Sequence, residues 1–167
     1  MYKKVITYNP FDLFSIRKAQ KEVDEYREWV LEKAHQLCKR LAEIGLQVAQ
    51  IYFIPEAWNG NADVTLSIEP LNDGYLVRAD GEDVCFLEFG TGVTAGLGYD
   101  SNVLEPPVDI SPGSWSHTAG SGKFAEDGYW YYNGQRLDGT IPQMGLNLAA
   151  SEVKQRFAQV AKEVFGS

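Results

Sequence analysis

Cysteine, histidine and long apolar runs are scarce in this chain, and each shortage excludes a class of protein. The only two cysteines, Cys38 and Cys85, lie far apart with no partner at metal-ligand spacing, so we expect free, buried thiols and no disulfide framework. No apolar stretch approaches the length of a membrane span, and the N-terminal residues lack the apolar core of a secretion signal. The sequence therefore predicts a protein that is made and stays in the cytosol, or leaves it only by lysis, with no membrane partner.

Basic residues are also in deficit. Fifteen Lys and Arg stand against twenty-three Asp and Glu, which gives a net charge of -8. A molecule with this charge repels phosphate backbones, because affinity for nucleic acid depends on the phosphates that Lys and Arg neutralise. We therefore expect no tight binding of nucleic acid.

Apolar residues are plentiful: 44% of the 167 residues are hydrophobic and 13% are aromatic, which is enough for the core of one domain spanning residues 1–167. Over residues 15–49 apolar side chains recur every three or four positions, the spacing of one face of a helix. Ser15 is the expected N-cap of this helix. Polar residues at Lys33 and Arg40 interrupt a strict heptad, so the helix is expected to pack on a globular core and not to form a coiled coil.

Residues 64–89 are predicted to form three strands, at residues 64–69, 75–79 and 84–89. The first alternates apolar and polar side chains, as a half-buried strand does. The pairs Asp73-Gly74 and Asp80-Gly81 supply the turns of an antiparallel meander. The third run is apolar on both faces until Glu88, so we expect another element or subunit to cover its second face.

Residues 90–128 form a long stretch rich in Gly, Ser, Pro and Asp, which predicts a loop. We expect residues 93–125 of this loop to stay mobile until a partner covers them. A hairpin at residues 129–137, turning at Asn133-Gly134, and a helix at residues 142–165 that starts at Pro142 complete the chain. The predicted fold is α+β: a long N-terminal helix and a C-terminal helix packed on a small antiparallel sheet, with a long glycine-rich loop.

Three patterns that resemble chemical sites are weak. Glu32, His35 and Cys38 are spaced three apart on the first helix, but they spread around it and no second His or Cys joins them. His117 lies near serines in a glycine-rich setting that lacks the rigid support of a catalytic triad, so a small hydrolase is only the third hypothesis. The glycines at 90–92 and 120–122 lack the strand and helix context of a phosphate loop. We expect no enzyme activity, no cofactor and no metal.

Aromatic residues cluster at Trp115 and at residues 129–132. Side chains alternate along a strand, so Trp130 and Tyr132 share one face and the two neighbouring tyrosines share the other. One pair is then exposed or covered by a neighbour. The cluster is either a strand with aromatics on both faces or a platform for sugar rings, and the second reading makes a carbohydrate-binding or adhesion module the alternative function.

One short element resembles a known family. The run Phe86-Leu87-Glu88-Phe89-Gly90-Thr91-Gly92 is similar to the Glu-Phe-Gly-Thr-Gly element of small tailed-bacteriophage proteins called minor tail, tail-completion or head–tail joining proteins, of the siphophage type. The layout is similar too: an amphipathic N-terminal helix, a glycine-rich insertion, the aromatic segment at residues 128–132 and a C-terminal helix that ends at residues 161–165.

The resemblance implies a non-catalytic virion protein that forms a ring of six copies at the neck or tail end. Its expected partners are further copies of itself, the tail tube or tail terminator, and the head connector. DNA would pass through the lumen without specific binding, which suits an acidic subunit. In this interpretation Glu88 projects from the third strand toward solvent or a neighbour, Phe89 enters the core, and Gly90 and Gly92 turn the backbone sharply. The residues assigned to the assembly interface are Glu88, Gly90, Thr91, Gly92, Trp115, Trp130 and Tyr132.

Overall fold

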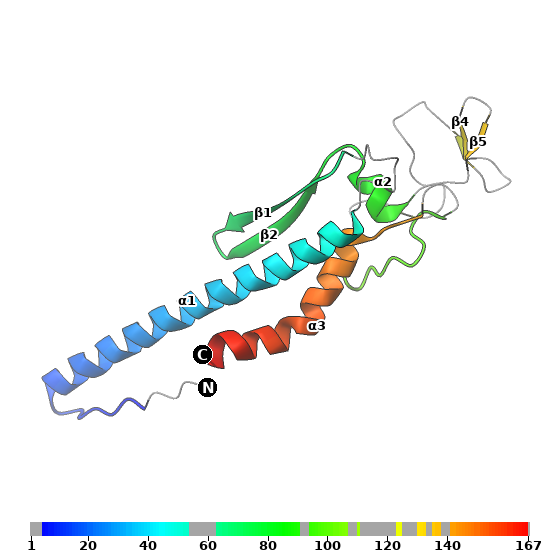
Figure 1. Ribbon diagram of the computed structural model, residues 1–167. Coiled ribbons are helices and arrows are strands. Elements are labelled where there is room, and N and C mark those ends of the chain that lie inside the picture. The colour runs from blue at the N-terminus through cyan, green and yellow to red at the C-terminus, as the bar shows by residue number, and fades with distance from the viewer. Residues whose placement is uncertain are drawn as a thin grey trace.

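The computed structural model describes residues 5–53, 63–90, 94–106, 110 and 141–166, and the backbone of residues 123–124, 130–132 and 135–137. In chain order the elements are α1 (Leu13–Tyr52), β1 (Thr65–Leu71), β2 (Gly74–Asp80), α2 (Val84–Phe89), β3 (Lys123–Phe124), β4 (Trp130–Tyr132), β5 (Gln135–Leu137) and α3 (Gly145–Gly166) (Figure 1). The long first helix, the C-terminal helix and the antiparallel sheet confirm the α+β class predicted from the sequence.

Helix α1 begins earlier than predicted. Asp12 is its N-cap, since the Asp12 carboxylate accepts a hydrogen bond from the Phe14 N–H at 3.0 Å. The expected N-cap, Ser15, lies inside the helix, and its hydroxyl accepts from the Asn9 N–H at 2.8 Å. The prediction for Ser15 was wrong because Asp12 satisfies the first orphan donors one turn earlier.

Helix α1 is the middle layer of the fold. The β1–β2 hairpin covers one side of its C-terminal half and α3 runs along another (Figure 1). Gly45 lies where the three layers meet: a methyl group added there would be 3.5 Å from Val153 of α3 and 3.5 Å from Val77 of β2. An added methyl group would therefore make ordinary van der Waals contact with both neighbours.

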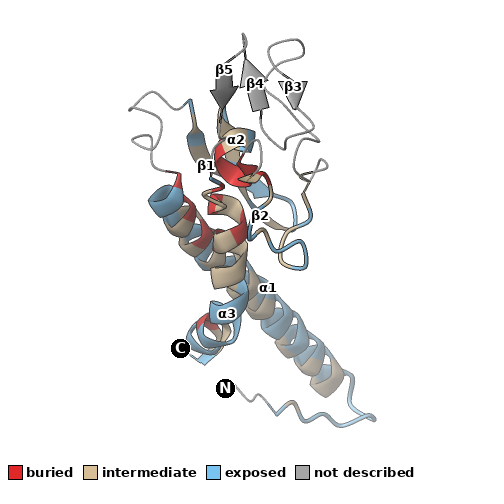
Figure 2. Ribbon diagram, turned by 90° about the vertical axis from the view of Figure 1, so that its right-hand side faces the viewer, coloured by how far each residue is buried: buried red, intermediate tan, exposed pale blue. Residues whose placement is uncertain are grey.

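The core consists of two groups of buried side chains along α1. The group near the end of α1 is Ala49, Phe53, Leu87 and Ala149, and the group halfway along is Leu37, Val160 and Val164. Figure 2 shows the buried residues gathered where α1, α2 and the start of α3 meet, whereas the N-terminal part of α1 is mostly exposed. The core therefore serves only the C-terminal half of the longest element.

Strands β1 and β2 form a two-stranded antiparallel hairpin, paired from Thr65↔Asp80 to Leu71↔Gly74. Asn72 and Asp73 make the turn, so the predicted pair Asp73-Gly74 was one residue late and Gly74 is the first residue of β2. The apolar positions Leu66 and Ala79 pack against the core, as the alternation predicts. Gly81, which follows β2, has a φ of 141°, so the Asp-Gly pair at the end of the hairpin needs glycine.

The predicted third strand, residues 84–89, is a helix. In α2 the Leu87 N–H donates to the Asp83 carbonyl at 3.0 Å, and the Gly90 N–H donates to the Phe86 carbonyl at 2.9 Å. A short run that is apolar on both faces has no period of two, and periodicity cannot distinguish it from a buried helical turn. The predicted three-stranded meander is therefore a hairpin followed by a helix.

Helix α3 starts three residues later than predicted. The Gln143 N–H donates to the Leu87 carbonyl at 2.6 Å, and Met144 has a φ of 55°, in the left-handed region. A residue in that conformation cannot continue a right-handed helix, so Pro142 lies before the helix and not in its first turn. Gly145 opens the helix against Phe53, whose ring lies 2.6 Å from the position of an added Cβ.

The expectation that only a partner could supply contacts to the glycine-rich stretch was wrong for residues 94–106. Ala95 is buried, the Gly96 N–H donates to the Phe89 carbonyl at 2.7 Å, and the Lys154 ammonium donates to the Asn102 carbonyl at 3.0 Å. These bonds to α2 and α3 supply the contacts that composition alone did not reveal. Residues 107–109 and 111–122 lie outside the described part.

A second small sheet contains β3, β4 and β5 in that order, all antiparallel. Strands β4 and β5 form the hairpin predicted at residues 129–137. Strand β3 pairs Lys123 with Tyr131 and Phe124 with Trp130, inside the region predicted as loop.

Candidate assembly site

Glu88 connects α2 to the start of α3. Its Oε2 accepts a hydrogen bond from the Leu146 N–H at 2.8 Å, and its Oε1 accepts from the Asn147 N–H at 2.9 Å. Glu88 is only 2% exposed. Asn147 is buried beside it and donates from its side-chain amide to the Asp100 carbonyl at 2.8 Å. One carboxylate thus ties α2 and α3 together, and Asn147 adds residues 94–106 to the same junction.

The chemistry of this contact is that of helix capping by a residue distant in sequence. The first N–H groups of a helix have no partner within the helix and carry the positive end of its dipole. A carboxylate accepts two such donors at once, and bonds to a charged acceptor are stronger than bonds between neutral groups. The expectation that Glu88 projects toward solvent or a neighbour was wrong, because α2 is helical and directs Glu88 onto α3.

Burial raises the pKa of the Glu88 carboxyl above its ordinary value of 4.5, although the Leu146 and Asn147 N–H groups act in the opposite direction. The native carboxyl therefore holds its proton more tightly than the unfolded one. Between 4.5 and the raised pKa the native state binds more protons than the unfolded state, so the free energy of unfolding falls as the pH rises through this window.

Glu88→Gln removes this titration and so makes a test possible. The stability advantage of the wild type over Glu88→Gln should be larger at about pH 4 than at about pH 7. The reason is that only the wild type has a carboxyl group at position 88 that takes up a proton on folding. Urea unfolding of both proteins at the two pH values measures the difference. An advantage that increased with pH would mean that the two backbone donors outweigh burial.

Phe89 and Gly90 behave as predicted. Phe89 is 5% exposed, and its ring centre lies 5.2 Å from that of Tyr99. Gly90 ends α2 with a φ of 70°, a conformation that favours glycine. The turn after Glu88 and Phe89 is therefore held from within the core.

The other residues assigned to the interface are only partly visible. Trp130 and Tyr132 lie on β4, paired with Leu137 and Gln135 of β5, and their side chains are outside the described part. Thr91, Gly92 and Trp115 also lie outside the described residues, as does His117. Of the residues assigned to the interface, Glu88 and Gly90 are therefore the two whose burial is described.

The chemical patterns on α1 do not form a site. Glu32 Oε1 accepts from Gln36 Nε2 at 3.2 Å, and His35 is exposed. Within the described residues no three His, Cys, Asp or Glu side chains are arranged to hold a metal ion. The prediction of buried thiols was wrong: Cys38 is half-buried and Cys85, on the outer side of α2, is exposed. None of the described helices combines the length and hydropathy of a membrane span.

Several large apolar side chains just before α1 and on its first half are exposed, which the sequence reasoning missed. The most exposed large side chains there are Phe11 (97%), Phe14 (78%), Leu13 (75%), Val23 (52%) and Leu31 (52%). The N-terminal residues run back along the helix (Figure 1) and leave a groove of about 710 Å³ against it. The residues lining this groove are Ile6, Tyr8, Pro10, Ile16, Ala19, Gln20, Val23 and Asp24.

The helix pattern contained a signal for the groove. Helix α1 has 40 residues and α3 has 22, so at 1.5 Å per residue α1 extends about 27 Å further than α3 can cover. The apolar stripe continues into this part at Ile16, Ala19 and Val23, which line the groove beside the N-terminal residues. Ile16 and Ala19 are half-buried there, whereas Val23 is 52% exposed. We name the exposed apolar residues of segment 11–31 the α1 surface.

Comparison of the chain with models of protein families, with curated proteins and with solved structures finds no match. The functional argument therefore rests on the residues of this chain and on the arrangement just described.

Proposed function

We propose that this protein is a structural subunit of a tailed-bacteriophage virion, which forms a ring of six copies at the head end of the tail and joins the tail to the head. The resemblance of residues 86–92 to the tail-completion family motivates the proposal. The α1 surface carries it, because five large apolar side chains within one segment of the chain are each more than half exposed, and exposed apolar side chains gathered in one region mark contacts with partners.

The shape of the subunit supports an assembly role. The core lies at one end of α1, and about 27 Å of the helix extends beyond α3, where residues 6–10 line a groove against it. The net charge of -8 suits a subunit beside a DNA channel, because like charge weakens lingering contacts with phosphates. Its partners in this proposal are further copies of itself, the tail tube or terminator, and the head connector.

Deletion of the gene from the phage genome tests the function. We expect filled heads and complete tails to accumulate unjoined, and electron microscopy of the lysate would show them. Wild-type protein supplied in trans should restore joined particles. Normal particle yield without the gene would contradict the proposal, and so would a block at head filling.

Variants of the α1 surface test the observation behind it. Phe14→Ser and Leu31→Ser should leave the helical circular dichroism and the melting transition of the isolated protein nearly unchanged, because both side chains are mostly exposed. Together they should abolish complementation. Lys18→Ala, on the same segment and also exposed, is the matched control and should complement normally.

A further inference from the structure

The β1–β2 hairpin is a two-stranded sheet, and within the described residues neither of its outer edges is paired. An unpaired edge presents a row of N–H and C=O groups that can accept a further strand. A two-stranded hairpin is also only marginally stable by itself in water, although here α1 supports one of its faces. The two edges thus carry the backbone N–H and C=O groups of the sheet that have no strand to pair with among the described residues.

Pro70 decides which backbone groups point outward. Because proline has no N–H, the pair Pro70↔Tyr75 cannot exchange two hydrogen bonds, so it is a non-bonded pair of the ladder. The hydrogen-bonded pairs are then the alternate ones, such as Glu69↔Leu76 and Ser67↔Arg78. It follows that the outward N–H groups are those of Leu66 and Ile68 on β1, and of Tyr75, Val77 and Ala79 on β2.

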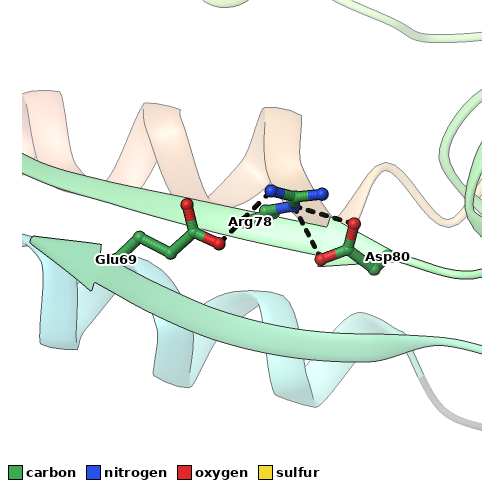
Figure 3. Close-up of polar contacts among 3 residues, drawn as sticks. All are labelled: Glu69, Arg78 and Asp80. Carbon is green, nitrogen blue, oxygen red and sulfur yellow. Dashed lines mark hydrogen bonds and ion pairs between the residues drawn. The ribbon is translucent and has the colours of Figure 1, made fainter.

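On the outer face of the hairpin, in contrast, the charged side chains form ion pairs within one chain. Arg78 Nη1 lies 3.3 Å from Glu69 Oε1, and Arg78 Nε lies 2.7 Å from Asp80 Oδ2 (Figure 3). These groups are about half exposed and bridge both strands. The charged groups of this face therefore need no partner, although Leu71 and Leu76 on the same face are exposed. The unpaired backbone groups lie at the two edges.

We propose that the hairpins of neighbouring copies pair edge to edge, β2 of one copy beside β1 of the next, into a continuous antiparallel sheet. The two edges of one hairpin differ, so the contact is head-to-tail. Contacts of this type form a ring when the rotation from one copy to the next closes. A foreign strand would satisfy one edge and leave the other open, whereas a ring of copies satisfies both edges in every subunit. Rotation about the ring axis keeps all hairpins in one orientation, which makes β2 antiparallel to the adjacent β1.

This inference rests on the proposed function only for the ring, and amide hydrogen exchange tests it separately. Exchange is measured at residue resolution on the free protein and on the oligomer, formed either alone or on purified tails. The outward N–H groups of Tyr75, Val77 and Ala79 should exchange fast in the free protein and slow by on the order of 100-fold in the oligomer, as ladder amides do. The inward N–H groups of Leu76 and Arg78 are an internal control and should be protected in both.

Ala79→Pro supplies the matching variant, because it removes one outward N–H and no bond within the hairpin. Ala79→Gly alters the same side chain but keeps the N–H. Both variants should fold, and only Ala79→Pro should lose oligomer formation. Should Ala79→Pro fail to fold, the exchange measurement on the wild-type protein still decides.

Three outcomes would overturn edge pairing between copies: outward amides that exchange equally fast in the oligomer, protection by a tail protein while only one copy is bound, or a protein that stays monomeric alone and on tails. None of them depends on the gene deletion. If phage lacking the gene still joined heads to tails, the proposed function would be wrong, whether or not the exchange measurement showed edge pairing.

Discussion

Phe89→Ala should lower the free energy of unfolding by about 3–5 kcal/mol, the usual cost of deleting a buried aromatic side chain and leaving a cavity. Phe89 is 5% exposed and packs against Tyr99, and its carbonyl accepts from the Gly96 N–H, so the surrounding chain has little freedom to collapse into the space. Urea unfolding followed by circular dichroism measures the change. It is the largest effect that we expect from a single substitution in α2.

Phe157→Ala is the matched control, because the same side chain on α3 is 52% exposed. Its effect should stay within about 1 kcal/mol, as for surface substitutions away from special features. Equal losses for the two variants would mean that the position of Phe89 in the core has been misassigned.

Glu88→Ala should destabilise the protein by about 2–4 kcal/mol, since it leaves two buried N–H groups of α3 without an acceptor. The loss is smaller than the sum of two charged hydrogen bonds, because the variant also removes a carboxylate that is costly to bury. Glu88→Gln should fall between the wild type and Glu88→Ala, because the amide keeps one acceptor oxygen. Thermal and urea unfolding of the three proteins would establish the order.

Glu69→Ala provides the comparison for Glu88→Ala. Glu69 forms a salt bridge with Arg78 at the surface, with nearly half of its side chain exposed, and exposed ion pairs contribute about 0–1 kcal/mol. If Glu88→Ala cost no more than Glu69→Ala, Glu88 would not be the group that holds the start of α3. Its role at an interface with another subunit would then return as the better interpretation.

The capping role of Glu88 also bears on assembly. Residues 86–90, the described part of the element that resembles the phage family, hold the C-terminal helix in place through Glu88 and end α2 at Gly90. A variant of Glu88 that fails to join heads to tails would therefore have to be compared at equal folded fraction before the defect is assigned to the interface.

The two long helices and the first hairpin were determined by the sequence itself. Apolar residues at three- and four-residue intervals predict α1 and α3, and alternation beside Asp73-Gly74 predicts β1 and β2, because these patterns depend only on neighbours along the chain. Gly90 belongs with them, since the need for a positive φ after an apolar run is also local.

Only the tertiary structure decided the state of residues 84–89 and the environment of Glu88. Leu87, Glu88 and Phe89 are consecutive and all buried, a pattern that suits a strand or a helix until the elements around them are known. The partners of Glu88, the N–H groups of Leu146 and Asn147, are 58 and 59 residues away, and the Pro142–Met144 segment sets where those donors start. A carboxylate normally belongs at the surface, and this one is buried because a distant helix end offers it two hydrogen bonds, which no local pattern encodes.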